Sequence, residues 1–490
     1  MKQNKALYLS AALYILWGVL CMIVSKEINY IVLFKWAVFI PLFTIAGSVM
    51  NKNVIYFSLI AIGMVQSVIV IMQQIGVFAS HNPFFPTIGF MGNPGIMGGF
   101  QAIAITACIV YLKKRQTIIL TSICIVFIAY SIIVSGSRAA WIAAVFGSIL
   151  LYRKPISTFF NIHKWSIAAV TIICIVGAAC LYFYRPGSAN ARLLIWRVSS
   201  DIIQDNLIFG IGPGQFRSTY MLYQASYFAR NPLSEYSLVA DNAAYPYNEF
   251  IRIAVEQGII GLSIFLSLVY FAIRRSSDSD ALAPLGALLL FSCFSYPIDK
   301  PAMAMLFPIL LGTCANNYKT TSDKSLLITS STILLFSIVC IAFFWTNTEK
   351  DIKDMRKAYN RKGAESLAHK LPHIYTDIRF NSLYFNLVQK YEEMQDTILF
   401  CFALPSCENW CDIGNFYYRT GNMELAEKYF CQATDMIPTR LLPKYYLWKL
   451  LNEQNREDEA VKMAKIIMEQ PIKVENTTTL RIRQEVKTSL

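Results

Sequence analysis

Long apolar runs separated by short polar segments occupy most of the chain. Each run has roughly the 17 to 25 residues needed to cross a bilayer as a helix. The runs begin near Tyr8, Tyr30, Val54, Pro94, Thr117, Ala139, Ser166, Asn248, Ala281, Ala302 and Ser325. The first is interpreted as a span and not as a cleavable signal peptide, because others follow it and no small-residue cleavage site is evident. The pattern predicts an all-α, polytopic membrane bundle of about eleven transmembrane helices.

Lysine and arginine clusters lie in the short segments between the runs and predict the topology. Cytoplasmic loops of membrane proteins carry an excess of these residues. With the N-terminus inside, one topology puts every cluster on the cytoplasmic side: Lys2, Lys5, Lys52, Lys113, Lys114, Arg115, Arg153, Lys154, Lys164, Arg274, Arg275, Lys319 and Lys324. The outer side then receives residues 73–93 and 135–138, a large loop at 185–247 between spans seven and eight, and the tail after Trp345. We expect a membrane domain over residues 1–345 and an outer helical domain over 346–490.

Composition excludes several function classes. The chain is 55% hydrophobic and 15% charged, against about 25% charged in soluble proteins. The net charge of +13 lies largely in the topology clusters, so we expect no nucleic-acid partner. His81 and the other histidines show no metal-ligand spacing, and no GxxxxGK[ST] loop occurs. We therefore expect no metal centre and no cofactor.

The tail carries a repeat signature. Several of its residues fall at the offsets of a tetratricopeptide repeat, W-x2-L-G-x2-Y, then A-x3-F, then P: Trp410, Ile413, Gly414, Tyr417, Ala426, Phe430, Ala433 and Pro438. A weaker copy keeps Leu447, Ala460 and Pro471. Such repeats stack to bury their apolar faces, and here they either cap the outer face of the bundle or offer a concave surface to a protein partner. Disulfides among Cys401, Cys407, Cys411 and Cys431 stay open, with three pairings.

Two arginines on the outer side are candidates for binding an anion. Arg138, in SGSRAAW, stands at the mouth of a span, where it either extends to lipid headgroups or binds an anionic ligand. Arg192 and Trp196 share a helical face, with Asp201 and Asp205 further along. A guanidinium suits phosphate oxygens because its planar fork donates two parallel hydrogen bonds.

Two loops carry further candidates. GIGPGQF, which contains Gly212, Gly214 and Gln215, is a turn whose backbone amides could approach an anion. Gly92, Asn93 and Pro94 open a helix, where Asn93 either caps the helix or contacts substrate.

Glu249, Arg252 and Glu256 are spaced to share one face of the helix that follows the large loop. Arg252 either pairs internally with Glu256 or contacts substrate. Glu249, nearer the surface, is a candidate for proton transfer, and Tyr247 and Asn248 are candidates for orienting a hydroxyl. Asp299 and Lys300 are expected to pair in a short outer loop.

The order of these motifs resembles that of the O-antigen ligase family. The matching stretches are GNP at 92–94, SGSRAAW at 135–141, R-x3-W at 192–196, GIGPGQF at 210–216 and YNEFIRIAVEQGIIGL at 247–262. The resemblance covers roughly residues 60–310. The tail resembles the branch of the family that carries tetratricopeptide repeats.

The resemblance implies an inverting, metal-independent glycosyltransferase. Its donor would be a glycan on a polyprenyl (undecaprenyl) diphosphate, and its acceptor a hydroxyl of lipid A-core or of a protein serine or threonine. The reaction would take place at the periplasmic face of the bacterial inner membrane, in lipopolysaccharide biosynthesis or protein O-glycosylation. The family's arginines imply that Arg138 and Arg192 hold the diphosphate, with Trp196, Asn248, Arg252, Asn93 and the GIGPGQF turn near the substrate.

One position departs from the family pattern. The family commonly has histidine before the asparagine of its last motif, and here that position is Tyr247. The proton acceptor is therefore open between Glu249 and Tyr247, with Asp241 as a further candidate. A polymerase would use the same residues, and a lipid-linked sugar flippase or a membrane scaffold with recruiting repeats are alternatives from other classes.

Overall fold

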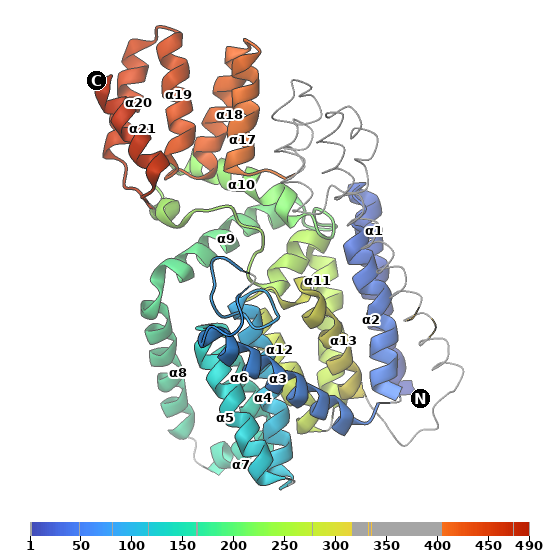
Figure 1. Cartoon of the computed structure of the whole chain (residues 1–490). Coiled ribbons are helices and arrows are strands. Elements are labelled where there is room, and N and C mark those ends of the chain that lie inside the picture. The colour runs from blue at the N-terminus through green and yellow to red at the C-terminus, as the bar shows by residue number, and fades with distance from the viewer. Residues whose placement is uncertain are drawn as a thin grey trace, which may run out of the picture. The chain divides into compact units, whose positions relative to one another are not determined.

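The computed structural model describes residues 2–48, 50–80, 82–115, 117–162, 165–276, 278–315, 404–473 and 475–489, with the isolated positions 332 and 335. Every regular element in these ranges is helical, with no strand among them, which confirms the all-helical fold class. His81, Cys401 and the predicted eleventh run near Ser325 lie outside the described residues. The chain forms two compact units, which are described separately below (Figure 1).

The first unit, called the membrane unit, comprises Met1–Arg185, Ile208–Pro213 and Tyr245–Ile341. Each of the first ten predicted runs is a helix in it. Its described elements are α1 (Lys2–Ser25), α2 (Tyr30–Ser48), α3 (Lys52–Gln74), α4 (Pro94–Lys113), α5 (Ile118–Val134), α6 (Arg138–Leu151), α7 (Arg153–Ile162), α8 (Trp165–Tyr184), α11 (Glu249–Arg275), α12 (Ser279–Ser292), η2 (Pro297–Asp299) and α13 (Pro301–Ala315).

By length and apolar composition, 5 described helices are able to cross a membrane: Ala6–Ser25, Tyr30–Ser48, Lys52–Gln74, Pro94–Lys113 and Glu249–Arg274. The count is 6 if one bent pair is taken as a span. Helices α5, α6, α12 and α13 are apolar but shorter. The chain is thus a multi-pass membrane protein, and the count of about eleven spans stays a prediction.

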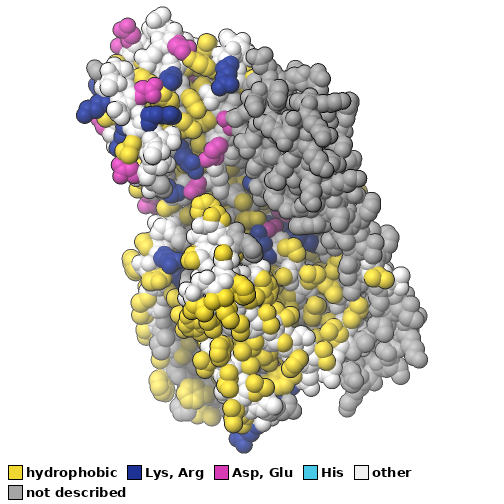
Figure 2. All heavy atoms as spheres, viewed as in Figure 1, with side chains coloured by type: hydrophobic (Ala, Val, Ile, Leu, Met, Phe, Trp, Pro, Cys, Tyr) yellow, Lys and Arg dark blue, Asp and Glu magenta, His cyan; other side chains and the backbone are white. Residues whose placement is uncertain are grey.

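Small residues allow the helices of the membrane unit to pack closely, as is usual between helices in a bilayer. A Cβ added to Gly98 of α4 would lie 2.4 Å from the Ser135 hydroxyl oxygen, and one on Gly147 of α6 would lie 2.6 Å from a methyl of Thr106. On the outside, large apolar side chains such as Phe57, Ile119 and Val126 are exposed. Figure 2 shows hydrophobic side chains covering much of the visible face of this unit, as a lipid-facing surface requires.

The second unit, called the loop–tail unit, comprises Pro186–Leu207, Gly214–Ala244 and Ala342–Leu490. Its described elements are α9 (Pro186–Asp205), α10 (Phe216–Arg230), η1 (Glu235–Val239), α17 (Cys407–Arg419), α18 (Met423–Met436), α19 (Leu441–Glu453), α20 (Glu457–Glu469) and α21 (Thr477–Thr488). Charged side chains of both signs are spread over α17–α21 (Figure 2). This is the surface expected of helices exposed to water.

Several residues of the repeat signature are buried among the tail helices. Trp410, Ile413, Ala426, Phe430 and Ala433 are buried, and a Cβ added to Gly414 would lie 2.5 Å from the Phe430 ring. In the weaker copy, Leu447 and Ala460 are also buried. The name tetratricopeptide repeat stays a prediction for these helices. Cys407, Cys411 and Cys431 have free thiols.

Polar contacts join part of the large loop to the tail. The Gln224 amide nitrogen donates to the Met436 carbonyl at 2.6 Å, and the Asn242 amide donates to Glu408 at 2.6 Å. Asp241 pairs with Arg440 and with Lys473, each at 3.2 Å. Burial alone would raise the pKa of Asp241, but Lys473 and Arg440 hold it below its ordinary value. The predicted domain boundary at 345/346 lies outside the described residues, yet most of the loop, which we expected in the membrane domain, belongs with the tail.

Candidate functional site

A tight turn fixes Arg138 at the start of α6. Gly136 has a φ of +59°, and Ser137 caps the helix by accepting from the Ala140 amide at 3.4 Å. The Trp141 indole donates to the Ile132 carbonyl at 3.0 Å and ties the turn to α5. Arg138 itself donates to the Leu181 carbonyl of α8, so its guanidinium is directed by protein contacts and not left to extend freely.

A second arginine, Arg185, which the sequence analysis missed, lies against the Gly136 turn that precedes Arg138. A Cβ added to Gly136 would lie 3.8 Å from Arg185 Nη2, and the positive charge of Arg185 acts electrostatically on Arg138. The Arg185 guanidinium also lies over the Tyr184 ring, 5.4 Å from its centroid. Two like charges held together favour an anion between or beside them. The end of α8 and the start of α6 therefore form the strongest candidate for a phosphate site among the described residues of the membrane unit.

Arg192 belongs to the loop–tail unit. On α9 it donates to the Ser188 hydroxyl at 3.1 Å, and Trp196 lies half-buried one turn further on. Because Arg138 and Arg192 fall in different units, a cavity shared by the two stays a prediction.

Glu249 is held on both of its oxygens. Its Oε2 accepts from Arg252 Nε at 2.6 Å, and its Oε1 accepts from the Ile298 backbone amide at 2.7 Å. The Glu249 side chain is 0% exposed. Arg252 also pairs with Glu256 at 3.7 Å, so the internal pair that we weighed as an alternative is present. This geometry suits positioning better than proton transfer, because both carboxylate oxygens are directed at protein partners that fix the start of α11.

The charges around Glu249 extend to two other helices. Lys35 of α2 lies 3.8 Å from the Asp299 carboxylate and donates to the Asp299 carbonyl at 2.8 Å. Lys300 pairs with Asp299 at 3.3 Å, as expected. Burial alone would raise the pKa of Asp299, but Lys35, Arg252 and Lys300 hold it below its ordinary value. We call this set the α11 network: Glu249, Arg252, Glu256, Asp299, Lys35 and Lys300.

The α11 network has equal numbers of formal positive and negative charges and borders a small cavity. The cavity measures about 50 Å³, and its lining includes Lys35, Arg252 and Glu256 among aromatic rings. Its size suits a few water molecules better than a sugar. Arg252 is thus committed to carboxylates, which argues against a direct contact with substrate.

The GIGPGQF turn donates hydrogen bonds to α11 where that helix is broken. Gly258 has non-helical torsions, φ 68° and ψ −175°, so the preceding carbonyls lose their helical partners. The amides of Ile211 and Gly212 donate to the carbonyls of Val255 and Glu256 at 2.9 and 3.0 Å. The Trp17 indole donates to the Gln257 carbonyl at 2.9 Å. The Gly212 amide is therefore bonded to protein, and the geometry favours a structural role for this half of the turn.

The remaining predicted residues lie mostly at helix starts. Asn93 caps α4 by accepting from Gly95 at 2.8 Å, and Asn248 caps α11 by accepting from Phe250 at 2.9 Å. In both cases the side-chain oxygen is occupied by capping. Gln215 precedes α10 and accepts from the Ser218 hydroxyl at 2.7 Å. Gly214, in the loop–tail unit, has a φ of +83°.

Tyr247 is held in an unusual backbone conformation. Its φ is +52°, a left-handed value that costs a non-glycine residue about 1–3 kcal/mol. Its ring meets the edge of Tyr296, with centroids 5.3 Å apart, and Tyr296 stacks on Tyr245 at 4.1 Å. Residues in such conformations cluster at functional sites, which keeps Tyr247 among the candidates.

Comparisons with known proteins match the part of the chain that contains most of these residues. Residues 123–266 match the family model described as O-antigen ligase. One similar protein, described as "Putative polysaccharide ligase" from Rickettsia conorii, is 26% identical over 206 residues, which is 37% of this chain and 46% of that protein. Another with the same description, from Rickettsia prowazekii, is 25% identical over 270 residues, 51% of this chain and 64% of that protein. The chain thus spans less than two thirds of either relative. The family match contains Arg138, Arg185, Arg192 and Glu249.

Proposed function

The chain belongs to the O-antigen ligase family through its residues 123–266, and on this premise we propose that it transfers a glycan from a polyprenyl diphosphate to an acceptor hydroxyl. The reaction is placed at the periplasmic face of the inner membrane. The acceptor is lipid A-core or a protein serine or threonine. We assign no metal to the reaction, since its leaving group needs only fixed positive charge.

The pair of Arg138 and Arg185 carries this proposal. Both residues lie in the membrane unit and inside the family match, Arg185 lies against the Gly136 turn that precedes Arg138, and its charge acts on Arg138. A diphosphate leaving group gains negative charge as its bond to the sugar breaks, and preorganised cations stabilise that charge. We assign Arg138 and Arg185 to the diphosphate, with Arg192 as a further ligand from α9.

In the proposed reaction the acceptor oxygen attacks the anomeric carbon from the face opposite the diphosphate. A new C–O bond forms while the bond from carbon to phosphate oxygen breaks, and its electron pair leaves with the diphosphate. Single displacement inverts the anomeric configuration. Positioning and charge stabilisation supply most of the acceleration.

Two routes remain for the hydroxyl proton. It passes either to an oxygen of the departing diphosphate or to Glu249, and the double engagement of Glu249 favours the first. In that case Glu249 positions the start of α11, and with it Tyr247 and Asn248. The pH profile of a Glu249 variant separates the two routes.

The test uses purified chain in lipid nanodiscs with a polyprenyl diphosphate-linked oligosaccharide and a hydroxyl acceptor. We expect release of polyprenyl diphosphate only when acceptor is present. Arg138→Ala and Arg185→Ala should each lower kcat by about 10²-fold or more, the effect of losing one oxyanion ligand. Arg274→Ala, exposed in the last turn of α11, is the charge-matched control. An intact carrier bond under all conditions would refute transfer and favour a flippase.

One observation bears on the flippase alternative. Transporters often bind substrate where a membrane helix is broken, and α11 is broken at Gly258. Here, however, protein donors occupy the carbonyls of Val255, Glu256 and Gln257. A polymerase remains the alternative within the same chemistry, and it differs in accepting a second carrier-linked glycan.

A further inference from the structure

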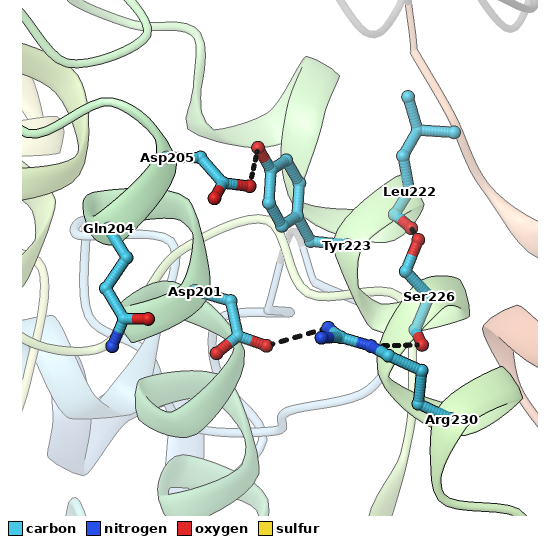
Figure 3. Close-up of a pocket in the computed structure, with 7 residues that line it drawn as sticks. All are labelled: Asp201, Gln204, Asp205, Leu222, Tyr223, Ser226 and Arg230. Atoms are coloured by element: carbon cyan, nitrogen blue, oxygen red, sulfur yellow. Dashed lines mark hydrogen bonds and ion pairs between the residues drawn. The ribbon is translucent and has the colours of Figure 1, made fainter.

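A polar pocket of about 390 Å³ lies within the loop–tail unit, between α9 and α10 (Figure 3). Its volume falls in the range of about 300–1,000 Å³ typical of small-molecule sites. Helix α9 supplies Asp201, Gln204 and Asp205, and α10 supplies Leu222, Tyr223 and Arg230. None of these residues belongs to the sites described above.

The two carboxylates retain acceptor capacity inside this pocket. Asp201 Oδ2 lies 3.0 Å from Arg230 Nη2, and the Tyr223 hydroxyl donates to Asp205 Oδ2 at 3.0 Å. Oδ1 of each aspartate receives no hydrogen bond from the part of the chain that the structure describes. An ionised carboxylate has about four lone-pair sites. Each aspartate can therefore accept from a ligand while keeping its present partner.

Holding α9 to α10 does not by itself account for these polar residues. The Arg230 side chain is 63% exposed, and an exposed pair of this kind contributes about 0–1 kcal/mol. The two helices also bury apolar side chains, including Val198 and Ile202 of α9 and Met221 of α10. The polar residues of the pocket are therefore available to bind a ligand.

The chemistry of the lining favours a neutral sugar over a phosphate. Two aspartates and one arginine give a formal charge of −1, which repels a diphosphate. Hydroxyl groups, in contrast, can donate to Asp201 and Asp205 and accept from Arg230. The apolar side chain of Leu222 and the Tyr223 ring offer contact to the C–H face of a pyranose.

The pocket is also separated from Arg192, the residue on the same helix that is proposed to bind the diphosphate. Asp201 lies nine positions after Arg192, which is about two and a half turns. Their side chains therefore point to opposite sides of α9, about 14 Å apart along its axis. A ligand in the pocket is a part of the substrate other than the diphosphate.

We propose that the pocket of Asp201, Asp205, Tyr223 and Arg230 binds the hydroxyl groups of a sugar ring of the donor glycan or of the acceptor. The inference rests on the proposed glycan transfer for the identity of its ligand. It makes the pocket a specificity site that selects the glycan without contacting the reacting bond.

The direct test measures binding to the full chain in nanodiscs. The probe is the free oligosaccharide cut from the lipid-linked donor by mild acid, so that it carries neither lipid nor diphosphate. Asp201→Asn with Asp205→Asn should weaken its affinity about tenfold or more, as expected when hydrogen bonds to charged groups are lost. Tyr223→Phe keeps both carboxylates and serves as a second variant. Glu235→Gln, an exposed carboxylate outside the pocket, is the charge control.

Kinetics then identify the source of the sugar. A raised KM for the donor with kcat retained assigns the pocket to the donor glycan, and a raised KM for a glycan acceptor assigns it to the acceptor. The proposal that the pocket binds a sugar is overturned if correctly folded variants keep the wild-type oligosaccharide affinity and KM values. A wild-type chain that binds the oligosaccharide but never releases polyprenyl diphosphate contradicts the transfer reaction instead, so the two failures are distinguishable.

Discussion

Arg252 Nε lies 2.6 Å from Glu249 Oε2 at a point where the Glu249 side chain is fully buried. The pair opens α11 and is completed by Glu256 and by the Ile298 amide. A buried charge is tolerated only when it is paired and hydrogen-bonded. The first turn of α11, with Tyr247 just before it, is therefore oriented by electrostatics as much as by packing.

Breaking this pair on one side should be costly. We expect Glu249→Ala to lower the free energy of unfolding by about 3–5 kcal/mol, since it removes the shorter of the two ion pairs of buried Arg252 and leaves the one with Glu256 at 3.7 Å. The double variant Glu249→Gln with Arg252→Gln removes one charge of each sign. It should be less destabilised than the sum of its two single variants, by a coupling free energy of about 0.5–3 kcal/mol. Thermal unfolding in detergent, followed by tryptophan fluorescence, measures both. Additive losses would show that the two residues act separately.

The same substitutions distinguish positioning from proton transfer. If Glu249 positions α11, Glu249→Gln should lower kcat while the shape of the pH–rate profile stays that of the wild type. If Glu249 is the general base, the acidic limb of the profile should disappear together with about 10²- to 10⁴-fold in rate. Turnover of lipid-linked oligosaccharide between pH 5 and 9 is the measurement. We expect the first result.

Gly210 is required where the loop meets broken α11. A Cβ at Gly210 would lie 2.4 Å from the Glu256 carbonyl carbon, and its φ is +66°. Gly210→Ala should therefore push Ile211 and Gly212 away from α11 and destabilise the chain by about 1–3 kcal/mol. Gly187→Ala, where an added Cβ meets nothing within 4 Å, is the matched control. Equal unfolding temperatures for the two variants would show that the turn does not stabilise the fold through Gly210.

The sequence predicted the features that are local in the chain. Apolar runs identified the helices, and Asn93 was recognised as a candidate cap because a cap acts on amides two or three residues away. Arg185 and Lys35 were missed as site residues because their partners, Arg138 and Asp299, are distant in sequence. The break at Gly258 was missed as well, since a glycine within an apolar run does not reveal which distant amides will occupy the freed carbonyls.

Asp241 is predicted to tie the large loop to the tail in a pH-dependent way. Because Lys473 and Arg440 hold the pKa of Asp241 below its ordinary value, the pairing stabilises the fold above about pH 4 and is lost as the pH falls through the folded-state pKa. Asp241→Asn should raise amide hydrogen exchange in residues 239–242 at pH 7. Glu424→Gln, an exposed carboxylate on α18, should not. Identical exchange in both variants would mean that the hydrogen bonds of Gln224 and Asn242 suffice.

Asp412, on α17, should have the opposite effect to Asp241: its ionisation should destabilise the fold as the pH rises. Burial, reinforced by Glu408, raises the pKa of Asp412 from 3.8 to about 7, against the opposing charge of Arg419. A carboxyl whose folded pKa is raised favours the folded state below the unfolded pKa, and that contribution is lost as the pH rises through the folded pKa. Asp412→Asn, which cannot ionise, should therefore gain stability over the wild type progressively between about pH 4 and pH 7, and then keep a constant advantage. Unfolding temperatures of the full chain at pH 4, 5.5, 7 and 8 measure this, with Asp458→Asn on the exposed face of α20 as control. A difference that is the same at every pH would show that Asp412 is ionised in the folded chain throughout.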